Sequence, residues 1–430
     1  MNVSVVGSGY VGTTLAACLA AVGHDVVNVD IDEDVVAAIN AGESPIHEEG
    51  LPELVAEHAG DNLRATTSYD AVPETDVTFI TVQTPSREDG SLDYSYVEAA
   101  AEMTGEALGG KTDAHVVAVK STVLPGTIED VVVPAVRGAA ERTGTEEIGF
   151  VANPEFLSEG TAVSDFWNAD KIVVGTSEPS AAATVRDLYH ADERLADVPV
   201  VETDVRTGEM IKYANNAFLA AKVSLVNELG NVCKRADIDS YEVADALGLD
   251  DRICAAFMRS GLGWGGSCFP KDVDALRAFA RQQEYPPELL DAAVDVNDRQ
   301  PERMVGLLRE HVDPDGARVA VLGLAFKPGT DDVRNSRALD VIEQLDDAGA
   351  DVVAYDPVAA ENARTALEVD IEYADSVSGA LSGADAALLT TEWPEFDGLS
   401  FDGMDRSVVI DGRRVDVDTG ALDVYEGLCW

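Results

Sequence analysis

Cysteine and histidine are scarce in this sequence. The 430 residues include five cysteines and six histidines. No two cysteines form a CxxC pair, and no histidine stands at a metal-ligand spacing from a group of other ligands; the cysteines are Cys18, Cys233, Cys254, Cys268 and Cys429. This pattern disfavours both the disulfide framework of a secreted protein and a structural zinc site. We therefore expect no bound metal.

Positive charge is scarce as well. The chain has 30 Lys and Arg against 80 Asp and Glu, which gives a formal net charge of -50. Such a chain repels nucleic acid and anionic membranes, so neither is an expected partner. The acids are spread among periodic apolar residues, which argues against a disordered acidic tail. We expect a solvated acidic surface suited to high salt, where screening makes the self-repulsion tolerable.

Long apolar runs are missing. No segment is apolar for long enough to span a bilayer, and no charged-then-apolar leader opens the sequence. These absences predict a soluble, cytoplasmic protein. At 430 residues the chain is too long for one ordinary core, so we expect two or three domains.

The first thirty residues predict a βαβ unit that binds a dinucleotide. A strand at 2–6, a helix at 13–22 and a strand at 25–30 surround the GxGxxG turn Gly7-Ser8-Gly9-Tyr10-Val11-Gly12. The first two glycines allow the turn and the approach of a pyrophosphate, and the third allows close helix packing. Asp30 stands where it can accept hydrogen bonds from ribose hydroxyls and repel a 2′-phosphate. The expected cofactor is therefore NAD rather than NADP.

Two further strands are predicted at 77–82 and 115–120, and each runs into a loop of small and polar residues. Loops after the carboxyl ends of strands line the ligand crevice of a doubly wound sheet. We expect four residues of these loops near the nicotinamide, namely Thr84, Pro85, Ser121 and Thr122. A later strand leads into residues 153–160, where Glu155 and Glu159 are either site residues or ordinary surface acids.

A long helix is predicted from Thr203 or Asp204 through Val232. Lys212 and Asn216 lie one turn apart on it and share a face, so both can donate to one oxygen. The alternative is a solvated lysine beside an asparagine. Lysines are rare in the chain, and four of them fall inside the motifs described here, which favours a task for Lys120, Lys212, Lys271 and Lys327.

The last third of the chain echoes the first. Residues 317–323 predict a strand that runs into a glycine turn and a helix. The later segment GADVVAYDP is similar in sequence to the earlier segment GHDVVNVDI. The turn lacks the dinucleotide fingerprint, but Lys327 within it can neutralise a phosphate. The expected architecture is α/β, with two Rossmann-like doubly wound domains (1–202 and 301–430), a central helical domain with a long spine helix (203–300), and a site in the cleft between the α/β domains.

The segment Gly265-Gly266-Ser267-Cys268-Phe269-Pro270-Lys271-Asp272 carries the chemistry of greatest interest. Lys271 would favour the thiolate of Cys268, which could then act as a nucleophile. Nearby glycines remove Cβ atoms from the approach to the sulfur; they are Gly261, Gly263, Gly265 and Gly266. The alternative is that Cys268 is a small buried hydrophobe and that the glycines only form a turn.

Taken together, seven segments resemble the nucleotide-sugar 6-dehydrogenase family over nearly the full length of the chain. They are VVGSGYVG, KSTVLPGT, NPEFLSEG, IKYANNAFLA, GWGGSCFPKD, LAFKPGTDDVRNS and DGRR. The resemblance implies a four-electron oxidation of a sugar C6 alcohol to a carboxylate, with two NAD and one water, through a thiohemiacetal and a thioester on Cys268. It is nearest to members that act on UDP-glucose. Members that act on GDP-mannose or UDP-N-acetylmannosamine are the alternatives, because the segment AAFMRSGLGW departs from the sequence that is usual in members that act on UDP-glucose.

The same resemblance implies roles for individual residues. Lys212 and Asn216 would stabilise an oxyanion, and Asp272 would orient Lys212 and the catalytic water. Glu155 and Thr122 would act as general base or position water. The residues implied for NAD are Gly7, Gly9, Tyr10, Val11, Gly12, Asp30, Thr84, Thr122, Glu159 and Lys271. The residues implied for the nucleotide sugar are Phe156, Leu157, Lys212, Asn216, Arg252, Phe257, Gly265, Lys327 and Arg413. Because Arg252 and Phe257 match positions at or across a dimer interface in relatives, a homodimer is expected.

Two functions of other classes also fit parts of the sequence. A β-hydroxyacid dehydrogenase joins a Rossmann domain to helices and uses Lys and Asn, but it needs no thiol and has no second nucleotide domain. An NAD-binding scaffold with a structural thiol would not turn over at all. The yield of NADH per substrate separates these alternatives: two for thiol chemistry and one for simple alcohol oxidation.

Overall fold

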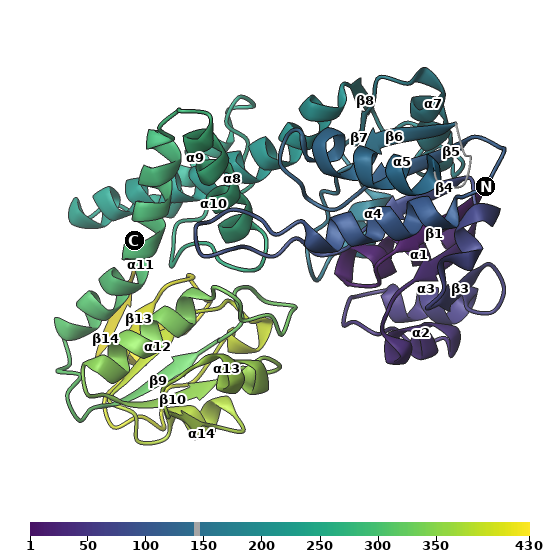
Figure 1. Cartoon of the computed structure of the whole chain (residues 1–430). Helices are drawn as coiled ribbons and strands as arrows, with labels where there is room; N and C mark the ends of the chain where they lie inside the picture. Colours follow the sequence, from purple (N-terminus) through teal and green to yellow (C-terminus); the bar gives the residue numbers. More distant parts are fainter. Residues whose placement is uncertain (142–146) are drawn as a thin grey trace. The chain divides into compact units, whose positions relative to one another are not determined.

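The computed structural model describes residues 1–141 and 147–430. These residues divide into two compact units, Met1–Asn215 and Asn216–Trp430 (Figure 1). The division falls inside α8 (Val205–Arg235), a helix of 31 residues. An α/β fold with two Rossmann-like sheets and a long central helix was predicted, and the structure confirms it.

The first unit is built on an eight-stranded sheet with the order β3-β2-β1-β4-β5-β6-β7-β8. All neighbouring strands are parallel except β6 and β7, which pair antiparallel. The strands are β1 (Asn2–Val6), β2 (Asp25–Val29), β3 (Leu63–Thr66), β4 (Val77–Ile80), β5 (His115–Val119), β6 (Ile148–Ala152), β7 (Ile172–Gly175) and β8 (Val200–Thr203). The strand order reverses between β1 and β4, and ligands bind at such a switch point in open α/β sheets.

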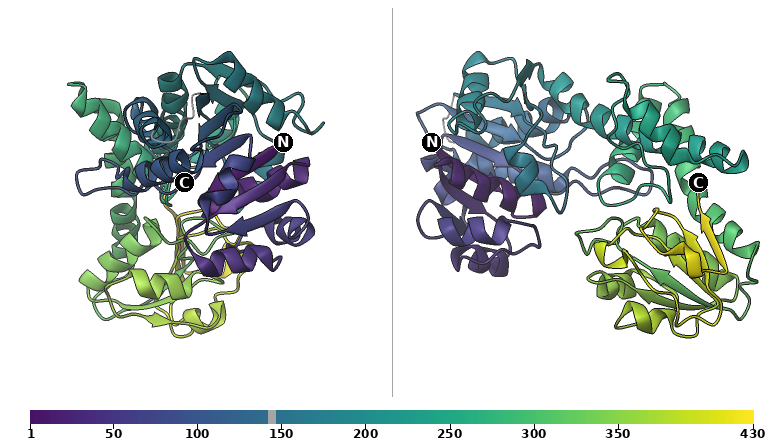
Figure 2. Two further views of the ribbon diagram at one scale, coloured as in Figure 1. Left: turned by 45° about the vertical axis from the view of Figure 1, so that its right-hand side comes forward. Right: turned by 180° about the vertical axis from the view of Figure 1, so that it is seen from behind.

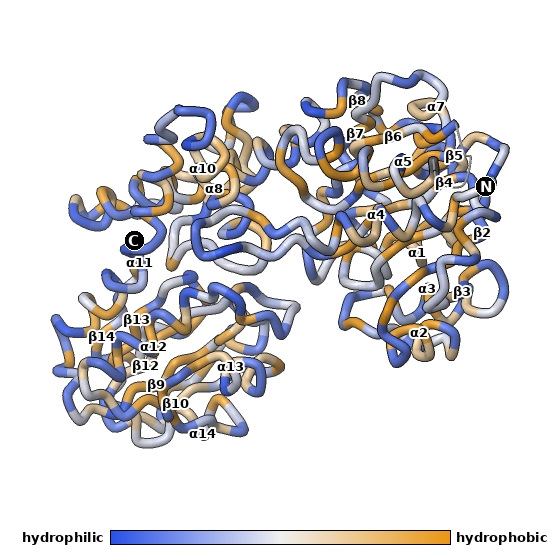
Figure 3. Tube along the Cα trace, in the orientation of Figure 1, coloured by the Kyte–Doolittle hydropathy of each residue, from blue (hydrophilic) through white to orange (hydrophobic). Residues whose placement is uncertain are grey.

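Helices cover both faces of this sheet (Figure 2). They are α1 (Tyr10–Val22), α2 (Glu33–Asn40), α3 (Leu51–His58), α4 (Ser95–Ala107), α5 (Val133–Glu141), α6 (Ala162–Trp167) and α7 (Pro179–Tyr189), with short helices η1 (Tyr69–Glu74) and η2 (Ile128–Val132). Residues of α1, α3, α6 and α7 pack on one face, and residues of α4, α5 and η2 pack on the other. Figure 3 shows the strands between these layers as largely hydrophobic, as expected for a parallel sheet buried on both faces.

The second unit contains a six-stranded sheet with the order β11-β10-β9-β12-β13-β14, in which every neighbouring pair is parallel. The strands are β9 (Arg318–Leu322), β10 (Asp351–Tyr355), β11 (Glu372–Tyr373), β12 (Ala386–Leu389), β13 (Val408–Asp411) and β14 (Val424–Gly427). This order repeats that of the first six strands of unit 1, so the internal echo in the sequence reflects a repeated topology.

The helices of unit 2 cover its sheet and form a helical segment before it. They are α9 (Ser240–Gly248), α10 (Phe269–Gln282), α11 (Glu288–Arg309), α12 (Arg337–Asp347), α13 (Ala360–Ala366) and α14 (Val377–Leu381), with η3 (Pro394–Phe396) and η4 (Thr419–Ala421). Residues of α11, α12 and α13 pack on one face of the sheet, and residues of α14 pack on the other.

Several predicted boundaries differ from the structure. The helix expected at 13–22 begins at Tyr10, so the last three residues of the glycine motif are already helical. The long helix begins at Val205 and continues to Arg235. None of the helices in residues 1–141 and 147–430 combines the length and apolar composition that crossing a bilayer requires.

Candidate active site

The predicted site residues lie in both units, and the glycine turn of unit 1 is the first cluster. Gly7 has a φ of +102°, and a Cβ on Gly12 would lie 1.9 Å from the carbonyl oxygen of Gly7. In contrast, a Cβ on Gly9 would have no atom within 4 Å. Gly9 is the N-cap of α1 and makes no side-chain cap hydrogen bond, so no side-chain cap at this position occupies the first N–H groups of the helix. These features fit a dinucleotide pyrophosphate.

Asp30 closes this turn. The N–H of Ser8 donates to Asp30 Oδ2 at 2.5 Å, and the N–H of Asp32 donates to Oδ1 at 3.0 Å. The carboxylate therefore lies beside the glycine turn at the end of β2, where the sequence predicted a ribose-binding acid.

The loops after β4 and β5 meet at two threonines. Thr84 Oγ1 donates to the carbonyl oxygen of Thr122 at 3.1 Å. Glu209 of α8 holds the loop of Thr122 in place. Its carboxylate accepts hydrogen bonds from the N–H groups of Gly126 (2.6 Å) and Ile128 (2.8 Å). Burial raises the pKa of Glu209 to about 7, although both N–H groups oppose the shift. Sequence reasoning did not identify Glu209, since its partners are about eighty residues away.

Glu155 and Lys212 form a buried ion pair. Lys212 Nζ lies 2.8 Å from Glu155 Oε1, and the two side chains are 4% and 8% exposed, respectively. The N–H of Leu157 donates to the other carboxylate oxygen at 2.5 Å. Burial by itself raises the pKa of Glu155. The charge and hydrogen bond of Lys212, the hydrogen bond from the Leu157 N–H and the charge of Lys120 lower it by more, so the pKa of Glu155 is below its usual value. Glu155 is thus an ionised carboxylate that can accept a proton.

The segment after Glu155 is held by contacts that the sequence did not reveal. The N–H of Gly160 donates to the hydroxyl of Tyr10 (2.5 Å) and to Glu48 (2.8 Å), and the N–H of Ala162 donates to Glu48 (2.6 Å). Glu159 therefore lies next to a residue that touches the glycine turn. Phe156 lies earlier in this segment, and the centre of its ring is 4.0 Å from the Lys171 ammonium.

In unit 2, Cys268 occupies the N-terminus of α10. Its side chain is exposed, and it is the N-cap residue of the helix. Ser267 Oγ lies 3.5 Å from the sulfur. Partial positive charge at a helix N-terminus favours a thiolate. The Lys271 ammonium pairs with Asp272, and its action on the thiol stays a prediction. The reading of Cys268 as a buried hydrophobe is wrong.

Asp272, one turn into α10, organises the residues around it. Its side chain is 1% exposed and lies 2.7 Å from the Lys271 ammonium. The amide of Asn216 donates to its other oxygen at 2.6 Å. The structure thus brings Asn216, Lys271 and Asp272 together, whereas Lys212 pairs with Glu155 in unit 1. An orienting role of Asp272 toward Lys212 stays a prediction.

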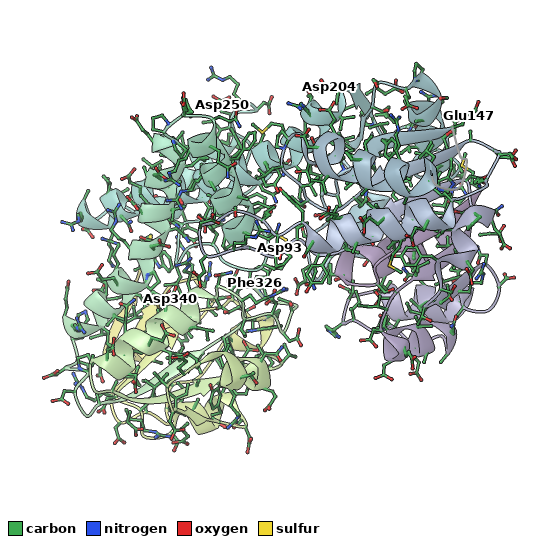
Figure 4. All side chains as sticks on the ribbon, in the orientation of Figure 1. Asp93, Glu147, Asp204, Asp250, Phe326 and Asp340 are labelled. Carbon is green, nitrogen blue, oxygen red and sulfur yellow. The ribbon has the colours of Figure 1, made fainter. Side chains whose placement is uncertain are left out.

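The expectation that the glycines near Cys268 leave open space is wrong. A Cβ on Gly265 would lie 2.1 Å from the carbonyl oxygen of Asn335, and one on Gly266 would lie 2.8 Å from the Phe326 ring (Phe326 is labelled in Figure 4). Gly261 and Gly263 are similarly close to Gly412 and Asn297. These glycines allow the turn to pack against other segments of unit 2, because any side chain would collide with protein atoms.

This packing brings the thiol turn to the loop that carries Lys327. The N–H of Gly266 donates to the carbonyl of Arg334 at 2.9 Å, and the Asn335 amide donates to the carbonyl of Gly266 at 3.1 Å. Both partners belong to the loop between β9 and α12, as does Lys327, whose ammonium lies 5.4 Å from the centre of the Phe326 ring. The segments carrying Cys268 and Lys327 are therefore fixed to each other.

The remaining predicted residues of unit 2 are Arg413, Arg252 and Phe257, and the ring centre of Phe257 lies 6.5 Å from that of Phe269, the residue after Cys268. Arg413 follows β13 and donates from Nε to the carbonyl of Thr390 at 2.9 Å. Arg252 pairs with Asp250 while its side chain is 88% exposed, and Phe257 is half-exposed with a φ of +60°. A role of Arg252 toward substrate stays a prediction. Among the residues that the structure describes, no group of His, Cys, Asp and Glu could hold a metal ion.

Comparison with known proteins gives this geometry a context. Three family models match the chain in order: the NAD binding domain of the UDP-glucose/GDP-mannose dehydrogenase family over residues 1–192, the central domain over 206–299 and the UDP binding domain over 320–417. The chain is a member of this family. The predicted family, the dehydrogenase class and the NAD cofactor are thereby confirmed.

Three relatives illustrate the range of similarity. A UDP-glucose 6-dehydrogenase of Haloferax volcanii is 56% identical over 431 aligned residues, covering the whole of both chains. A solved UDP-glucose dehydrogenase structure from Pyrobaculum islandicum is 41% identical, with a TM-score of 0.93 and coverage of 100% of this chain and 98% of that chain. A GDP-mannose 6-dehydrogenase of Pseudomonas putida is 34% identical over the full length of both chains.

Proposed function

We propose that this protein oxidises the C6 alcohol of UDP-glucose to a carboxylate, producing UDP-glucuronate with NAD as oxidant. The observation that carries the proposal is the exposed thiol of Cys268 at the N-terminus of α10, one turn before the buried Asp272. UDP-glucose is favoured over other nucleotide sugars by the 56% identity to the Haloferax volcanii enzyme.

The cofactor is held by the unit 1 residues that fit a dinucleotide. The turn from Gly7 to Gly12 receives the pyrophosphate, and Asp30 binds the ribose hydroxyls. Thr84, Thr122 and Glu159 are assigned to the nicotinamide end, and Lys271 of unit 2 is assigned to the cofactor as well. NAD, when bound, accepts one hydride in each of the two oxidation steps.

Cys268 makes the second oxidation possible. After the alcohol has become an aldehyde, the thiolate adds to its carbonyl carbon, and a C–S bond forms while the oxygen becomes an oxyanion. The Lys212 ammonium and the Asn216 amide stabilise that oxyanion. Loss of a hydride from the same carbon then gives a thioester on Cys268.

Hydrolysis completes the reaction and restores the thiolate. Glu155 accepts a proton as water adds to the thioester carbon, with Thr122 positioning the water. The C–S bond breaks, the sulfur leaves as a thiolate, and the carboxylate remains on the sugar. One alcohol, one water and two NAD thus give one carboxylate, two NADH and three protons.

The other assigned residues hold the substrate. Phe156 and Leu157 contribute backbone contacts from unit 1, and Gly265 lies in the thiol turn. Lys327 and Arg413 come from the UDP binding domain and supply positive charge for the diphosphate. Arg252 and Phe257 are assigned to the substrate from positions at or across a dimer interface, which is why a homodimer is part of the proposal.

We retain the three-part division of the chain within this proposal. Residues 1–202 bind NAD, residues 203–300 form a central helical domain that dimerises, and residues 301–430 bind the nucleotide sugar. The family models cover similar ranges.

The yield of NADH tests the reaction. With limiting UDP-glucose, we expect two NADH per sugar and a carboxylate product. Replacing Cys268 with Ser should lower turnover by at least about a hundredfold, because the alkoxide is not available at neutral pH as the thiolate is. Cys254→Ser, which alters another exposed cysteine, is the matched control and should keep the parent rate.

Other outcomes would contradict the proposal. One NADH per sugar, or a serine variant at position 268 with the parent rate, would exclude thioester chemistry. GDP-mannose is the second candidate, since the Pseudomonas putida enzyme of that name is 34% identical. A kcat/KM for GDP-mannose above that for UDP-glucose would transfer the proposal to that substrate.

A further inference from the structure

Lys120 is a buried cation without a role in the proposed reaction. It follows β5 and is 7% exposed. Its ammonium donates to Asn153 Oδ1 (3.1 Å) and to the hydroxyl of Tyr189 (2.9 Å). Tyr189 donates to the same Asn153 oxygen at 2.9 Å, and the Asn153 amide donates to the carbonyl of Val173 at 2.7 Å. The ammonium is therefore fixed in place by neutral groups, and one of them, Asn153, stands two residues before Glu155 in the segment after β6.

The charges that act on Lys120 are those of Glu155 and Lys212. Burial lowers the pKa of Lys120 to about 8, with Glu155 opposing the shift and Lys212 adding to it. In return, Lys120 helps to lower the pKa of Glu155. Tyr189 is neutral, because burial raises its pKa. Cys18, which acts on Tyr189, is neutral as well, because burial raises its pKa to about 12 although the Arg194 guanidinium opposes the shift.

The proposed reaction makes conflicting demands on Lys212. This residue neutralises the buried Glu155, and it also has to stabilise the oxyanion of the substrate. A buried carboxylate that loses its ion-pair partner is strongly disfavoured in its charged form. Without another cation, Glu155 would take up a proton when Lys212 turns to the substrate, and it could no longer act as a base.

We propose that Lys120 is a positioning residue that acts through Glu155: its ammonium, fixed by Asn153 and Tyr189, holds a second positive charge beside the Glu155–Lys212 ion pair and keeps the Glu155 carboxylate ionised through the reaction. This inference rests on the proposed function, because it needs Glu155 to act as a base. It assigns Lys120 no contact with the substrate.

The test is the pH profile of kcat/KM for Lys120→Met, which removes the charge and keeps an unbranched side chain. We expect the acid limb to move up by about one pH unit, which lowers kcat/KM on that limb about tenfold, while the plateau changes less. Lys120→Arg, which keeps the charge, should leave the limb at the parent pH. Lys111→Met is the matched control, since the Lys111 ammonium is also partly buried and donates to the carbonyls of Pro73 and Thr75.

Lys120→Gln provides a second neutral variant if the methionine variant does not fold. A neutral variant with a lower melting temperature but an unmoved acid limb would overturn the inference, since the charge would then serve packing alone. Failure of both neutral variants to fold, with Lys120→Arg folded, would overturn it for the same reason. If the parent protein releases no NADH with any nucleotide sugar, the proposed function fails instead, and the two failures are distinguishable.

Discussion

At the scale of single residues, the glycine turn of unit 1 contains one glycine that the fold requires and one that only a bound cofactor would require. Gly12 has no room for a Cβ, because the Gly7 carbonyl oxygen would lie 1.9 Å away and Thr81 Oγ1 2.6 Å away. Gly9 has room for one in the protein by itself. The two positions should therefore respond differently to the same methyl group.

We expect Gly12→Ala to destabilise the protein without cofactor by roughly 1–3 kcal/mol, because backbone atoms have to move. Gly9→Ala should leave the melting temperature unchanged but weaken NAD binding, since the added methyl occupies the side on which the pyrophosphate approaches. Thermal unfolding and fluorescence titration with NADH measure the two effects. Gly138→Ala is the control in α5, where a Cβ would meet no atom within 4 Å. Equal loss of stability in both turn variants would contradict this account.

At the scale of elements, β5 carries a buried histidine that is neutral in the fold. His115 is 1% exposed, its Nδ1 lies 2.9 Å from the carbonyl oxygen of Thr75, and its Nε2 lies 2.8 Å from Thr78 Oγ1. Nδ1–H therefore donates to the carbonyl, and Nε2 accepts from the hydroxyl. Burial lowers the pKa of His115 to about 4.

This histidine should make the protein sensitive to acid. Because its pKa is lower in the folded than in the unfolded state, its contribution is present above about pH 6.5 and is lost as the pH falls toward 4, by up to about 3 kcal/mol. We expect His115→Gln to have a lower free energy of unfolding at pH 7 but a smaller loss between pH 7 and 5, as measured by urea unfolding. His47→Gln, on the loop before α3, is the matched histidine control. An unchanged dependence in His115→Gln would contradict the assignment.

The long helix α8 exposes a stripe of apolar side chains in unit 2: Phe218, Leu225, Leu229 and Val232. Spacings of seven, four and three residues place them on one face of the helix. Exposed apolar patches of this kind mark interfaces, and a second copy of the chain is the partner that the proposed dimer supplies.

We expect Leu225→Asp combined with Leu229→Asp to convert a dimer to a monomer in light scattering. The doubled variant should also lose activity, because the proposal places the substrate-contacting Arg252 at or across the dimer interface. Leu249→Asp, a highly exposed position outside the stripe, is the control and should remain dimeric. A parent protein that is monomeric at all concentrations, or a doubled variant that stays dimeric, would remove the dimer from the proposal.

At the scale of the whole molecule, the net charge of -50 sets the dependence on salt. The screening length falls from about 10 Å at 0.1 M salt to about 3 Å at 1 M, so the repulsion among surface acids weakens. We expect the melting temperature to rise steadily from 0.1 to about 2 M potassium chloride. The similarity to a protein of Haloferax volcanii agrees with this expectation.

Charge neutralisation separates screening from other effects of salt. Changing three exposed acids to their amides should raise the melting temperature at low salt and reduce its slope against salt; suitable positions are Glu57, Glu102 and Glu368. Circular dichroism at several salt concentrations measures both. A parent protein that is equally stable at 0.1 and 2 M potassium chloride would contradict the expectation that charge repulsion limits the stability of the fold.

The local pattern of the sequence was enough to predict much of the fold. Periodic apolar residues and the glycine turn predicted β1, β2, β4 and β5 to within about two residues, because these strands are buried on both faces and read as continuous apolar runs. The repeated segment predicted the second sheet. The start of α1 at Tyr10 was missed, since the glycines of a turn give no sign of where helical hydrogen bonds begin.

The candidate site was predicted less evenly. Cys268, Asp272 and Asn216 were identified, but their arrangement was not: Asp272 accepts from Asn216 and Lys271, while Lys212 pairs with Glu155. Glu48, Glu209 and the Asn153–Tyr189 pair were missed altogether. Each acts on partners far away in sequence, and in an acidic chain one more glutamate carries no signal.

The sequence by itself determined the α/β class, the dinucleotide turn, the family and the surface charge. All of these follow from residues that are close in the chain or from composition, where local sterics and hydrophobic periodicity act directly. Only the tertiary structure decided that the glycines beside Cys268 serve packing, that Cys268 begins a helix, and that Lys212 pairs with Glu155. These facts depend on segments meeting across the fold, where burial and charge act through space and leave no trace in the local pattern.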